Sequence, residues 1–502
     1  MTRKMMTLLL AVMLTVALTV SSAIAQENAS WLPEWDVDAD VVIVGFGPAG
    51  AMAAKSAMEN GASVLVVEKE TKEFAGGSAP TSYGFIKPYT ADEIYASAAG
   101  RLTKENAQRI YDKENESLAW MAENGLEMNG MTSVGYGMGF YNVMVAAMEK
   151  LGTNVLYETP AKKIIADPDT KEVYGIQCEN AAGEKVYIKA NKGVILCTGG
   201  YLANKDLMNR FHFADMPDFE NIGAPTQTGD GLLMAMEIGA GIDGVSEQQI
   251  EWYGYSYKKA SDEMGTAILH TVGAMSPDAR IFVNSKGKRF MNEEINITHS
   301  KFQMPFLEYD GTFPTYNGYS NLPMYVIFDS TMFNADAVGP TGPGCGYASN
   351  YGIYNWSADN QAELERGWLV KADTIDELVV KLAEQSGNEQ IDAEALKATI
   401  ATYNSYCEAG EDPEFGRESF FLNPVSEGPF YAAQIVPTAC YTIGGLRGGE
   451  NGETLDWQGN PIPRLYHAGD IGQPTKYLIS ALQGCMALGD IAGEACSQLE
   501  SH

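Results

Sequence analysis

The sequence predicts an α/β protein built on a Rossmann-like domain, and three observations support this prediction. An apolar run at residues 41–44 leads directly into the glycine-rich segment GFGPAG at 45–50. A helical segment follows at 51–58, and a second apolar run at 64–67 ends in an acid, Glu68. The order strand, glycine-rich turn, helix, strand and carboxylate is the pattern of a βαβ unit that binds a dinucleotide.

The glycine-rich turn predicts a site for phosphate groups. Its glycines let the backbone turn tightly and approach a pyrophosphate, whose charge is favoured at the N-terminus of the following helix. Glu68 lies 18 residues after Gly50, a spacing at which a carboxylate can accept hydrogen bonds from a ribose. A second stretch, GGSAPTSYG at 76–84, also allows backbone amides to approach a ligand. The alternative is a glycine-rich turn that holds no ligand.

The next part of the chain is predicted to continue in α/β style. Residues 91–125 are predicted to be helical, with Gly125 as the C-cap. Short strands separated by turns are predicted between 154 and 198, and the last one runs into the motif TGGY. The motif TGDG then precedes a helical segment at 232–238, and its Asp230 can cap that helix or bond a ligand hydroxyl.

Residues from about 245 to 435 differ in composition, because they are rich in Tyr, Asn, Gly and Pro. A strand is predicted at 279–284, and helices are predicted at 375–384 and 392–407. Four residues of the second helix share one face at helical spacing and are predicted to pack in a core: Leu396, Ile400, Tyr403 and Cys407.

The C-terminal part returns to the pattern of the first, with a motif LYHAGD that contains Asp470 and a final helix at 483–497. We therefore divide the chain into a first segment of the Rossmann-like domain (36–244), an inserted domain (245–435) and a second segment (436–502) that completes the Rossmann-like domain. The sequence contains no second dinucleotide fingerprint, so no site for NAD(P)H is predicted.

Residues 1–25 are predicted to be a Sec-type signal peptide. Arg3 and Lys4 precede an uncharged apolar run at 5–20, and the sequence AIA at 23–25 is a cleavage pattern. The run is too short for a confident membrane span. We therefore expect an exported protein, periplasmic or extracellular, with no stable membrane span after cleavage.

The composition limits the possible partners and metal centres. The net charge of −31 argues against nucleic acid or an anionic membrane surface, and it permits a basic electron carrier. The seven cysteines form no CxxC or CxxCH motif, which argues against haem attachment and iron–sulfur ligation. We predict no metal site and expect buried free thiols.

Nine motifs, in this order, make the chain resemble the flavoprotein family of soluble fumarate reductases and 3-ketosteroid dehydrogenases over about residues 38–502. They are VVIVGFGPAG, GGSA, CTGGY, TGDG, GKRFMNE, YNSYCEAGEDPEFGR, PFYA, TIGGL and LYHAGD. The resemblance implies a Rossmann-like FAD-binding domain with an inserted α+β capping domain. FAD would lie between the first and second segments, and the mobile capping domain would close over the flavin ring.

The resemblance also implies contacts to FAD. Ala49 and Glu68 would contact the ADP moiety, Asp230 and Asp470 would bond to cofactor hydroxyls, and the backbone near Leu488 would approach the flavin ring. Ser78, Ala79, Ser82 and Gly84 would lie along the pyrophosphate and the flavin. The full set of predicted cofactor-binding residues is Gly45, Gly47, Ala49, Gly50, Glu68, Lys69, Gly77, Ser78, Ala79, Ser82, Gly84, Thr198, Gly199, Gly200, Asp230, Asp470 and Leu488.

The substrate-binding positions depart from the family pattern. Family members that act on dicarboxylates bind both carboxylates with Arg and His. Here Tyr441 replaces the usual His before the TIGG turn, Tyr253 replaces a His of the capping domain, and His270 replaces a Thr. His299 aligns with the proton-donating Arg, and the C-terminal clamp Arg is missing. These replacements argue against fumarate as the substrate.

We therefore predict His299, Tyr477, Tyr253, Tyr441 and His270 as catalytic candidates, because a phenol or an imidazole can supply a proton as hydride arrives. The expected reaction transfers hydride from flavin N5 to an activated C=C bond of a neutral enone or an aromatic or unsaturated acid. A separate cytochrome or flavin-carrying protein would supply the electrons, as in anaerobic respiration.

Three alternatives stay open at this point. The chain has 26 tyrosines, so any one of the candidate tyrosines can have a packing role instead. The enzyme can run in the opposite direction, as a ketosteroid-type dehydrogenase that desaturates its substrate. A flavin-binding electron relay without catalysis is the third alternative.

Overall fold

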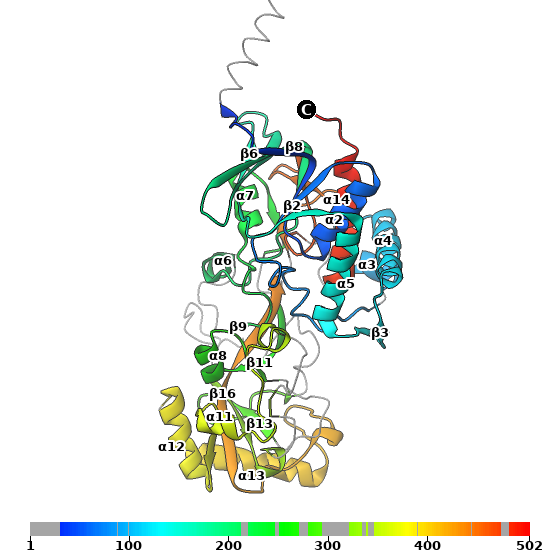
Figure 1. Ribbon diagram of the computed structural model, residues 1–502. Coiled ribbons are helices and arrows are strands. Elements are labelled where there is room, and N and C mark those ends of the chain that lie inside the picture. Colours follow the sequence, from blue (N-terminus) through cyan, green and yellow to red (C-terminus); the bar gives the residue numbers. More distant parts are fainter. Residues whose placement is uncertain are drawn as a thin grey trace, which may run out of the picture.

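The computed structural model describes residues 31–502 except for eleven positions or segments: 88, 99, 212–218, 246–249, 271–279, 294–320, 334–337, 340–345, 389, 443 and 473–480. The side chains of 250–253, 269–270 and 481 are also outside the description. Figure 1 shows two lobes, one above the other. We call the upper one, which contains β1, β2 and β8, the cofactor lobe, and the lower one, which contains β13 and α13, the cap lobe.

An eight-stranded sheet forms the centre of the cofactor lobe. Its order is β18-β19-β8-β1-β2-β5, and the β6–β7 hairpin pairs with β8 through β7. The five strands from β19 to β5 are parallel, as expected for a Rossmann-like domain. The strands are β1 (Val37–Val44), β2 (Val64–Val67), β5 (Asn154–Leu156), β6 (Ala161–Ala166), β7 (Val173–Glu179), β8 (Lys185–Leu196), β18 (Glu453–Leu455) and β19 (Pro461–His467).

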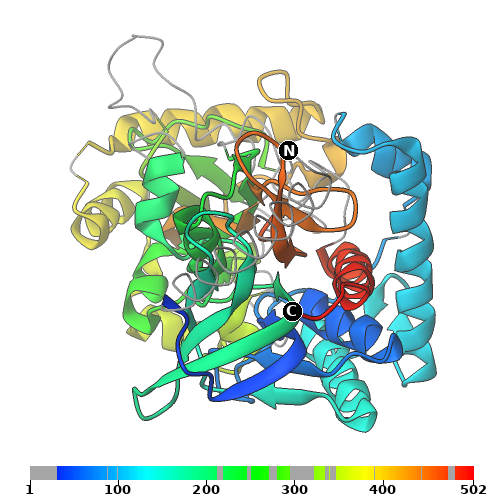
Figure 2. The ribbon, with the colours of Figure 1, turned by 90° about the horizontal axis from the view of Figure 1, so that it is seen from above.

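Two helices rich in small residues pack closely beside this sheet, α2 (Pro48–Glu59) and α14 (Ala481–Ser497). A Cβ atom added at Gly489 would lie 2.1 Å from the carbonyl oxygen of Ala49, and one added at Gly493 would lie 2.3 Å from that of Ala53. The close approach of the two helices therefore requires glycine at both positions. Figures 1 and 2 show α14 between α2 and α4 (Lys104–Glu123).

The structure corrects two sequence predictions in this lobe. The segment 91–125 is not one helix, because α3 (Ala91–Ser97) ends and Thr103 begins α4 with its own side-chain cap. The C-cap of α4 is Asn124, and Gly125 follows it with φ +99°. Asp230 does not cap α7 (Asp230–Glu237): the N-cap is Gly229, and no side chain caps it.

A seven-stranded sheet forms the centre of the cap lobe, in the order β12-β11-β16-β14-β13, and β15 and β9 also pair with β16. All pairs are antiparallel except β9–β16. Helices α12 (Ile375–Ser386) and α13 (Ala393–Ala409) lie in the lower part of this lobe (Figure 1). The strands are β9 (Glu220–Asn221), β11 (Ile250–Tyr257), β12 (Leu269–His270), β13 (Arg280–Val283), β14 (Met324–Phe328), β15 (Val370–Ala372) and β16 (Phe430–Thr442).

The predicted apolar face of α13 is confirmed, because Leu396, Ile400 and Tyr403 are buried and Cys407 is partly buried. The GKRFMNE motif has a structural role in the same lobe. Arg289 donates two hydrogen bonds to the carboxylate of Glu293 and one to Asp412, and all three side chains are buried. A buried ion pair of this kind requires both partners, because removing one leaves an uncompensated charge.

Strand β16 joins the two lobes. It runs through the cap lobe and leads directly to β17 (Gly445–Leu446), which pairs with β10 (Ile242–Asp243). The division predicted at 435/436 therefore falls inside one continuous strand. The remaining elements are β3 (Met128–Asn129), β4 (Thr132–Ser133), α5 (Tyr136–Leu151), α6 (Lys205–Phe211), α8 (Lys258–Met264), α9 (Ser330–Phe333), α10 (Tyr347–Asn350), α11 (Gln361–Glu365) and the 3₁₀ helix Ser419–Phe421.

Three predictions about membranes, metals and thiols can be compared with the described part of the chain. No helix there is long and apolar enough to cross a membrane. The same residues contain no cluster of three metal-ligating His, Cys, Asp or Glu side chains. Of the six cysteines described, all free, four are buried as expected: Cys178, Cys197, Cys485 and Cys496. The predicted signal peptide lies outside the described residues.

Candidate cofactor and active site

The turn between β1 and α2 has no room for side chains at two of its glycines. Gly45 has φ +100°, and a Cβ atom there would lie 2.5 Å from the carbonyl oxygen of Cys197. A Cβ atom at Gly50 would lie 2.0 Å from the carbonyl oxygen of Gly45. Gly47 is the N-cap of α2, and no side chain caps this helix. The N-terminus of α2 is therefore built to bring backbone groups, not side chains, toward an anionic ligand.

Glu68 at the end of β2 is held against this turn. Its side chain is buried, and its two carboxylate oxygens accept hydrogen bonds from the backbone N–H groups of Phe46 (2.8 Å) and Glu70 (2.9 Å). The hydroxyl of Tyr141 on α5 donates to the carbonyl oxygen of Phe46 at 3.1 Å. The acid that the sequence assigns to a ribose thus lies beside the phosphate turn in a fixed orientation.

Lys69 and Asp230, both predicted to contact the cofactor, form an ion pair with each other. The Nζ atom of Lys69 lies 2.8 Å from Asp230 and donates to Thr228 Oγ1 at 2.7 Å. Thr228 also donates to the second oxygen of Asp230 at 2.9 Å. This arrangement joins β2 to the TGDG motif, and the predicted bond from Asp230 to a cofactor hydroxyl stays a prediction.

The GGSA loop is stabilised by its own short-range bonds. Gly77 has φ +57°, a conformation that favours glycine. The carbonyl oxygen of Ala79 accepts hydrogen bonds from both the N–H and the hydroxyl of Ser82. A Cβ atom at Gly84 would lie 1.9 Å from the Oγ of Ser133, so the end of this loop packs directly on β4.

Gln227 is a site residue that the sequence analysis missed. Its side chain is buried, and its Nε2 donates to the Oγ of Ser78 and, at 3.3 Å, to the carbonyl oxygen of Cys440 on β16. Gln227 thus connects the predicted cofactor loop to the strand that enters the cap lobe. Its position directly before the TGDG motif is the signal that could have identified it.

The remaining predicted cofactor residues lie around the ends of β8 and β19. Gly199 has φ +72°, and a Cβ atom at Gly200 would lie 2.3 Å from the Oγ1 of Thr442. Asp470 is buried and accepts a hydrogen bond from the thiol of Cys485 at 3.5 Å. Ala49 is buried on α2, and Leu488 is partly buried on α14.

These residues fit a bound nucleotide cofactor. The glycine turn gives room for phosphates, and Glu68 and Asp230 offer carboxylate oxygens to hydroxyl groups. In addition, two buried oxygens, Thr198 Oγ1 and Gln227 Oε1, have no hydrogen-bond partner among the described residues. Buried polar atoms are normally paired, so these two are suited to a ligand with polar groups.

The structure describes three of the five catalytic candidates in part. Tyr253, His270 and Tyr441 lie on adjacent strands of the cap sheet, where Tyr441 is paired with Glu251 and His270 with Tyr255. Tyr441 is partly buried, one residue after the Cys440 carbonyl that Gln227 binds. The side chains of Tyr253 and His270, and all of His299 and Tyr477, lie outside the described residues.

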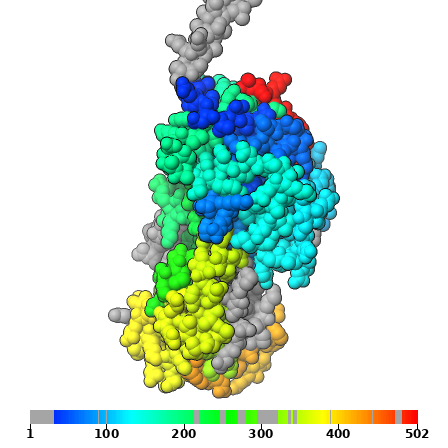
Figure 3. Space-filling model, in the orientation of Figure 1, coloured from blue at the N-terminus to red at the C-terminus, as the bar shows by residue number. Residues whose placement is uncertain are grey.

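A second contact joins the cap lobe to the GGSA loop. The N–H of Gly346 donates to the carbonyl oxygen of Thr81 at 2.7 Å, and Asn350 Nδ2 donates to the carbonyl oxygen of Pro80, also at 2.7 Å. In Figure 3, the yellow region of the cap lobe touches the blue region of the cofactor lobe near the middle of the face shown. The sequence analysis did not predict this contact, because its residues are about 270 positions apart.

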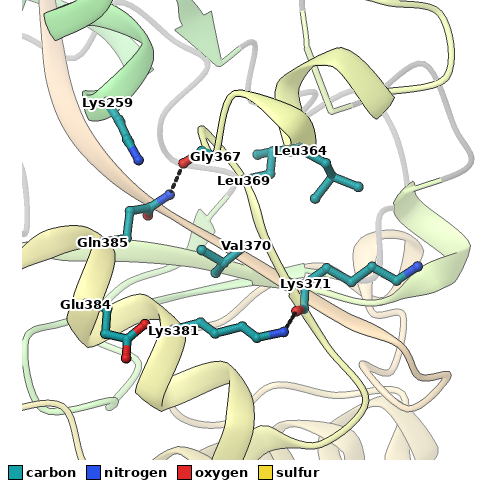
Figure 4. A pocket seen from close by; sticks show the side chains of 9 residues that line it. All are labelled: Lys259, Leu364, Gly367, Leu369, Val370, Lys371, Lys381, Glu384 and Gln385. Atoms are coloured by element: carbon teal, nitrogen blue, oxygen red, sulfur yellow. Dashed lines mark hydrogen bonds between the residues drawn. The ribbon is translucent and has the colours of Figure 1, made fainter.

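An open pocket of about 610 Å³ on the cap lobe is not the candidate site (Figure 4). All nine of its lining residues belong to α8, α12 and the segment 364–371, and none belongs to the cofactor lobe. Two of its polar side chains are bound locally: Lys381 donates to the carbonyl oxygen of Lys371, and Gln385 Nε2 donates to that of Gly367.

The fold and the site are those of a protein in which a capping lobe is joined to a lobe of the dinucleotide-binding type. Residues 129–473 match the family model described as FAD binding domain, and residues 40–200 match the one described as FAD dependent oxidoreductase. The chain belongs to the FAD-binding-domain family. It is a flavin-dependent oxidoreductase, and its cofactor is FAD, which confirms the predicted family and cofactor.

Known proteins of related sequence and fold are consistent with this assignment. Vinyl phenol reductase of Lactiplantibacillus plantarum is 28% identical over 475 residues, 86% of this chain and 89% of that protein. NADH:fumarate oxidoreductase of Klebsiella pneumoniae is also 28% identical, over 86% of this chain and 44% of that longer protein. The structure of 3-ketosteroid Δ1-dehydrogenase from Sterolibacterium denitrificans aligns with a TM-score of 0.73 and 19% identity, covering 92% of this chain and 99% of that one.

Proposed function

We propose that this protein is an FAD-dependent reductase that transfers hydride to an activated C=C bond of an acceptor that is not a dicarboxylate. The observation that carries the proposal is the position of Tyr441. It lies near the end of β16 that enters the cofactor lobe, next to the carbonyl that Gln227 binds from the cofactor side. A phenol stands there in place of the His that grips a dicarboxylate in the resembling enzymes.

Bound FAD would supply the hydride at N5. The residues of this chain would bind and orient the acceptor, exclude water and deliver a proton to the neighbouring carbon. Tyr253, His270 and Tyr441 stand on three adjacent strands of the cap sheet, which supports the proposal that they act at one side of the acceptor. Such groups polarise a neutral carbonyl and give up a proton in the same step as hydride arrives. His299 and Tyr477 remain proposed donors of the same chemical type.

The names of the relatives support the reaction class and leave the acceptor open. One relative is a vinyl phenol reductase, which agrees with a neutral aromatic acceptor, and another is named for fumarate. The choice rests on the missing Arg and His groups. Without them, a dicarboxylate would lose the charged partners that offset the cost of burying its two carboxylates.

The test is the oxidation of a reduced viologen dye by the purified FAD-loaded protein with a panel of acceptors. The panel contains fumarate, arylacrylates, a vinyl phenol and neutral enones including steroids. We expect dye oxidation with a neutral or aromatic member and none with fumarate. Turnover of fumarate would contradict the proposal. Desaturation of ketones with slow dye oxidation would indicate the dehydrogenase direction, and a reduced flavin that no acceptor reoxidises would indicate an electron relay.

A substitution tests the role of Tyr441 directly. Tyr441→Phe removes the hydroxyl and keeps the ring, so we expect acceptor reduction to fall by about 100-fold or more if this phenol moves the proton. The flavin absorbance spectrum should stay unchanged. Tyr431→Phe is the matched control, because Tyr431 lies on the same strand but stacks on Phe333 inside the cap lobe. Equal activities of the two variants would exclude Tyr441 as the donor.

We also propose that electrons come from a separate cytochrome or flavin-carrying protein and that the enzyme works outside the cytoplasm in anaerobic respiration. The absence of a second dinucleotide fingerprint in the 502 residues and the net charge of −31 support a basic carrier protein. Reduction of the bound flavin by NADH alone, as fast as by reduced viologen, would contradict this. Amino-terminal sequencing of the exported protein should begin at Gln26.

A further inference from the structure

A buried acid and a buried amide meet between α4 and α14. Glu114 on α4 is 2% exposed, and Gln483, the third residue of α14, is 1% exposed. The Nε2 of Gln483 donates to Glu114 Oε2 at 3.1 Å and to the carbonyl oxygen of Lys87 at 2.6 Å. Three segments are therefore joined at one point: α4, the first turn of α14 and the segment after the GGSA loop.

The hydrogen-bond pattern favours a proton on Glu114. Both N–H groups of Gln483 are used, so a flipped amide would place its oxygen against two acceptors. The remaining atoms are Glu114 Oε1 and Gln483 Oε1, and both are buried without a partner among the residues described. Glu114 therefore receives one hydrogen bond from the described residues, at Oε2, and its Oε1 has no donor. A buried carboxylate with so few donors is costly, so this environment favours the neutral acid.

No described basic side chain forms an ion pair with Glu114. The charged groups on the surrounding elements are engaged with one another: Lys113 with Asp490 and Glu116, Arg109 with Glu494, Lys87 with the ring of Tyr89, and Glu93 with Thr90. Residues 473–480, which include Lys476, lie outside the described residues. Burial therefore dominates and raises the pKa of Glu114 to about 7.

The position of this pair relates it to the flavin. Gln483 precedes Leu488 by five residues on α14, and Lys87 follows Gly84 by three residues; Leu488 and Gly84 are both proposed to lie at the flavin. Gln483 thus belongs to one of the two segments that the proposed cofactor site places around the ring, and it bonds to the other. The inference below rests on that proposed site and on FAD as the cofactor.

We propose that Glu114 is a proton-accepting group coupled to the charge of the flavin. Reduction of bound FAD by two electrons from the reductant and one proton would add a negative charge at this place. Glu114, in its carboxylate form, then takes one further proton from solvent, and it releases that proton when hydride leaves for the acceptor. The coupling is mutual: a reduced flavin favours the neutral acid, and an ionised Glu114 disfavours reduction. Glu114 would act through Gln483 and through charge, so it is a positioning residue.

The test is the midpoint potential of the bound flavin in the full FAD-loaded protein, measured from pH 5.5 to 8.5 without any acceptor. Wild type and Glu114→Gln should agree at pH 5.5, where Glu114 is neutral in both redox states. Above about pH 7 the wild-type potential should fall more steeply, by about 30 mV per pH unit for one extra proton per two electrons. Glu116→Gln, an exposed acid on the same helix, is the control and should follow wild type.

Coincident slopes for wild type and Glu114→Gln would overturn the proposal. If Glu114→Gln does not retain FAD, the infrared difference spectrum of the wild type on reduction decides. At pH 8 reduction should create one carbonyl band of a protonated carboxylic acid, and its absence would overturn the proposal as well. Neither measurement uses an acceptor, so the outcome is independent of whether the protein reduces C=C bonds.

Discussion

His467 is a buried histidine that stands directly before the AGD turn of the proposed cofactor site. Its Nδ1 lies 2.9 Å from Thr454 Oγ1, and a Cβ atom at Gly472 would lie 2.5 Å from its Nε2. The ring thus packs against backbone on one side and a hydroxyl on the other. Burial lowers the pKa of His467 to about 4. The native protein therefore holds this residue neutral under conditions in which an unfolded chain would protonate it.

This pKa predicts a loss of stability in acid. Between pH 6.5 and about 4 the unfolded state binds a proton at this position and the native state does not, so the free energy of unfolding should fall as the pH falls. Protonation of this residue in the unfolded state should lower the free energy of unfolding by about 3 kcal/mol between pH 6.5 and pH 4. Urea unfolding at pH 5 and pH 7.5 measures the free energy of unfolding at each pH. The difference between the two free energies should be smaller in His467→Gln than in wild type.

Two other groups must be separated from this effect. Burial also lowers the pKa of His502, so His502→Gln is the matched comparison and should change the pH dependence less. Glu114 acts in the opposite direction, because its raised pKa makes its contribution fall as the pH rises from 4.5 through about 7. A His467→Gln variant with the same pH dependence as wild type would contradict the assignment.

At the residue scale, spacing alone predicted a glycine-rich turn beside an acid, because Gly45, Gly50 and Glu68 lie on a short stretch of chain. The structure confirms that turn and its contact to Glu68, and the contacts to phosphate and ribose stay predictions. Gln227 and Glu114 were not predicted, because their significance depends on contacts to Cys440 and Gln483, more than 200 positions away. The periodicity of a single sequence gives no information about contacts between residues so far apart.

At the scale of elements, the α2–α14 pair is the most specific packing in the cofactor lobe. Neither helix carries a continuous polar face, and glycines on α14 let it approach the backbone of α2. Because α2 begins at the phosphate turn and α14 passes near the proposed ring position, the distance between the helices determines the geometry of the site. The sequence predicted both helices but not their contact.

A glycine substitution tests this packing. Gly489→Ala would place a methyl group 2.1 Å from the carbonyl oxygen of Ala49, so the helices must separate. We expect destabilisation by about 1–3 kcal/mol, as for other overpacked positions, together with weaker FAD retention. Thermal unfolding and the flavin content of the purified protein measure the two effects.

Gly183→Ala is the control for this substitution. Gly183 has φ +80° in a surface turn, with nothing within 4 Å of an added Cβ atom. It should therefore cost about 1–2 kcal/mol of backbone strain but leave FAD retention unchanged. Equal flavin loss in both variants would show that general destabilisation, not helix spacing, releases the cofactor.

The division of residues 91–125 into α3 and α4 shows a limit of sequence reasoning at the same scale. The helical pattern was correct for both pieces, but the boundary was missed although Gly100, with φ +87°, interrupts the pattern. The signal was the capping residue Thr103, whose side chain accepts the N–H of Asn106. Of the two roles predicted for Asp230, the cap is wrong, because α7 begins at Asp230 itself and Gly229 is its N-cap. The carboxylate pairs with Lys69, and its bond to a cofactor hydroxyl stays a prediction.

At the scale of the whole molecule, two of the connections seen in the described residues help to hold the cap lobe against the cofactor lobe. The first is the chain itself, because β16 is part of the cap sheet and its C-terminal end leads into the cofactor lobe. The second consists of hydrogen bonds from Gly346 and Asn350 to the GGSA loop. The sequence predicted an inserted domain from a change in composition. It could not predict the contact, because both partners are loops without a pattern of their own.

The hydrogen bond of Asn350 predicts how loosening the lobes affects function. Asn350→Ala removes a donor to the carbonyl oxygen of Pro80 at 2.7 Å, a bond of about 0.5–1.5 kcal/mol. If the cap lobe must stay on the GGSA loop to exclude water, acceptor reduction should fall by about two- to tenfold, while thermal unfolding shifts little. Asn388→Ala is the matched control, because Asn388 donates to Ser285 within the cap lobe at 3.0 Å. In Asn350→Ala the broken bond joins the two lobes, whereas in Asn388→Ala it lies within the cap lobe. An equal loss of turnover in the two variants would therefore show that the contact between the lobes has no special role.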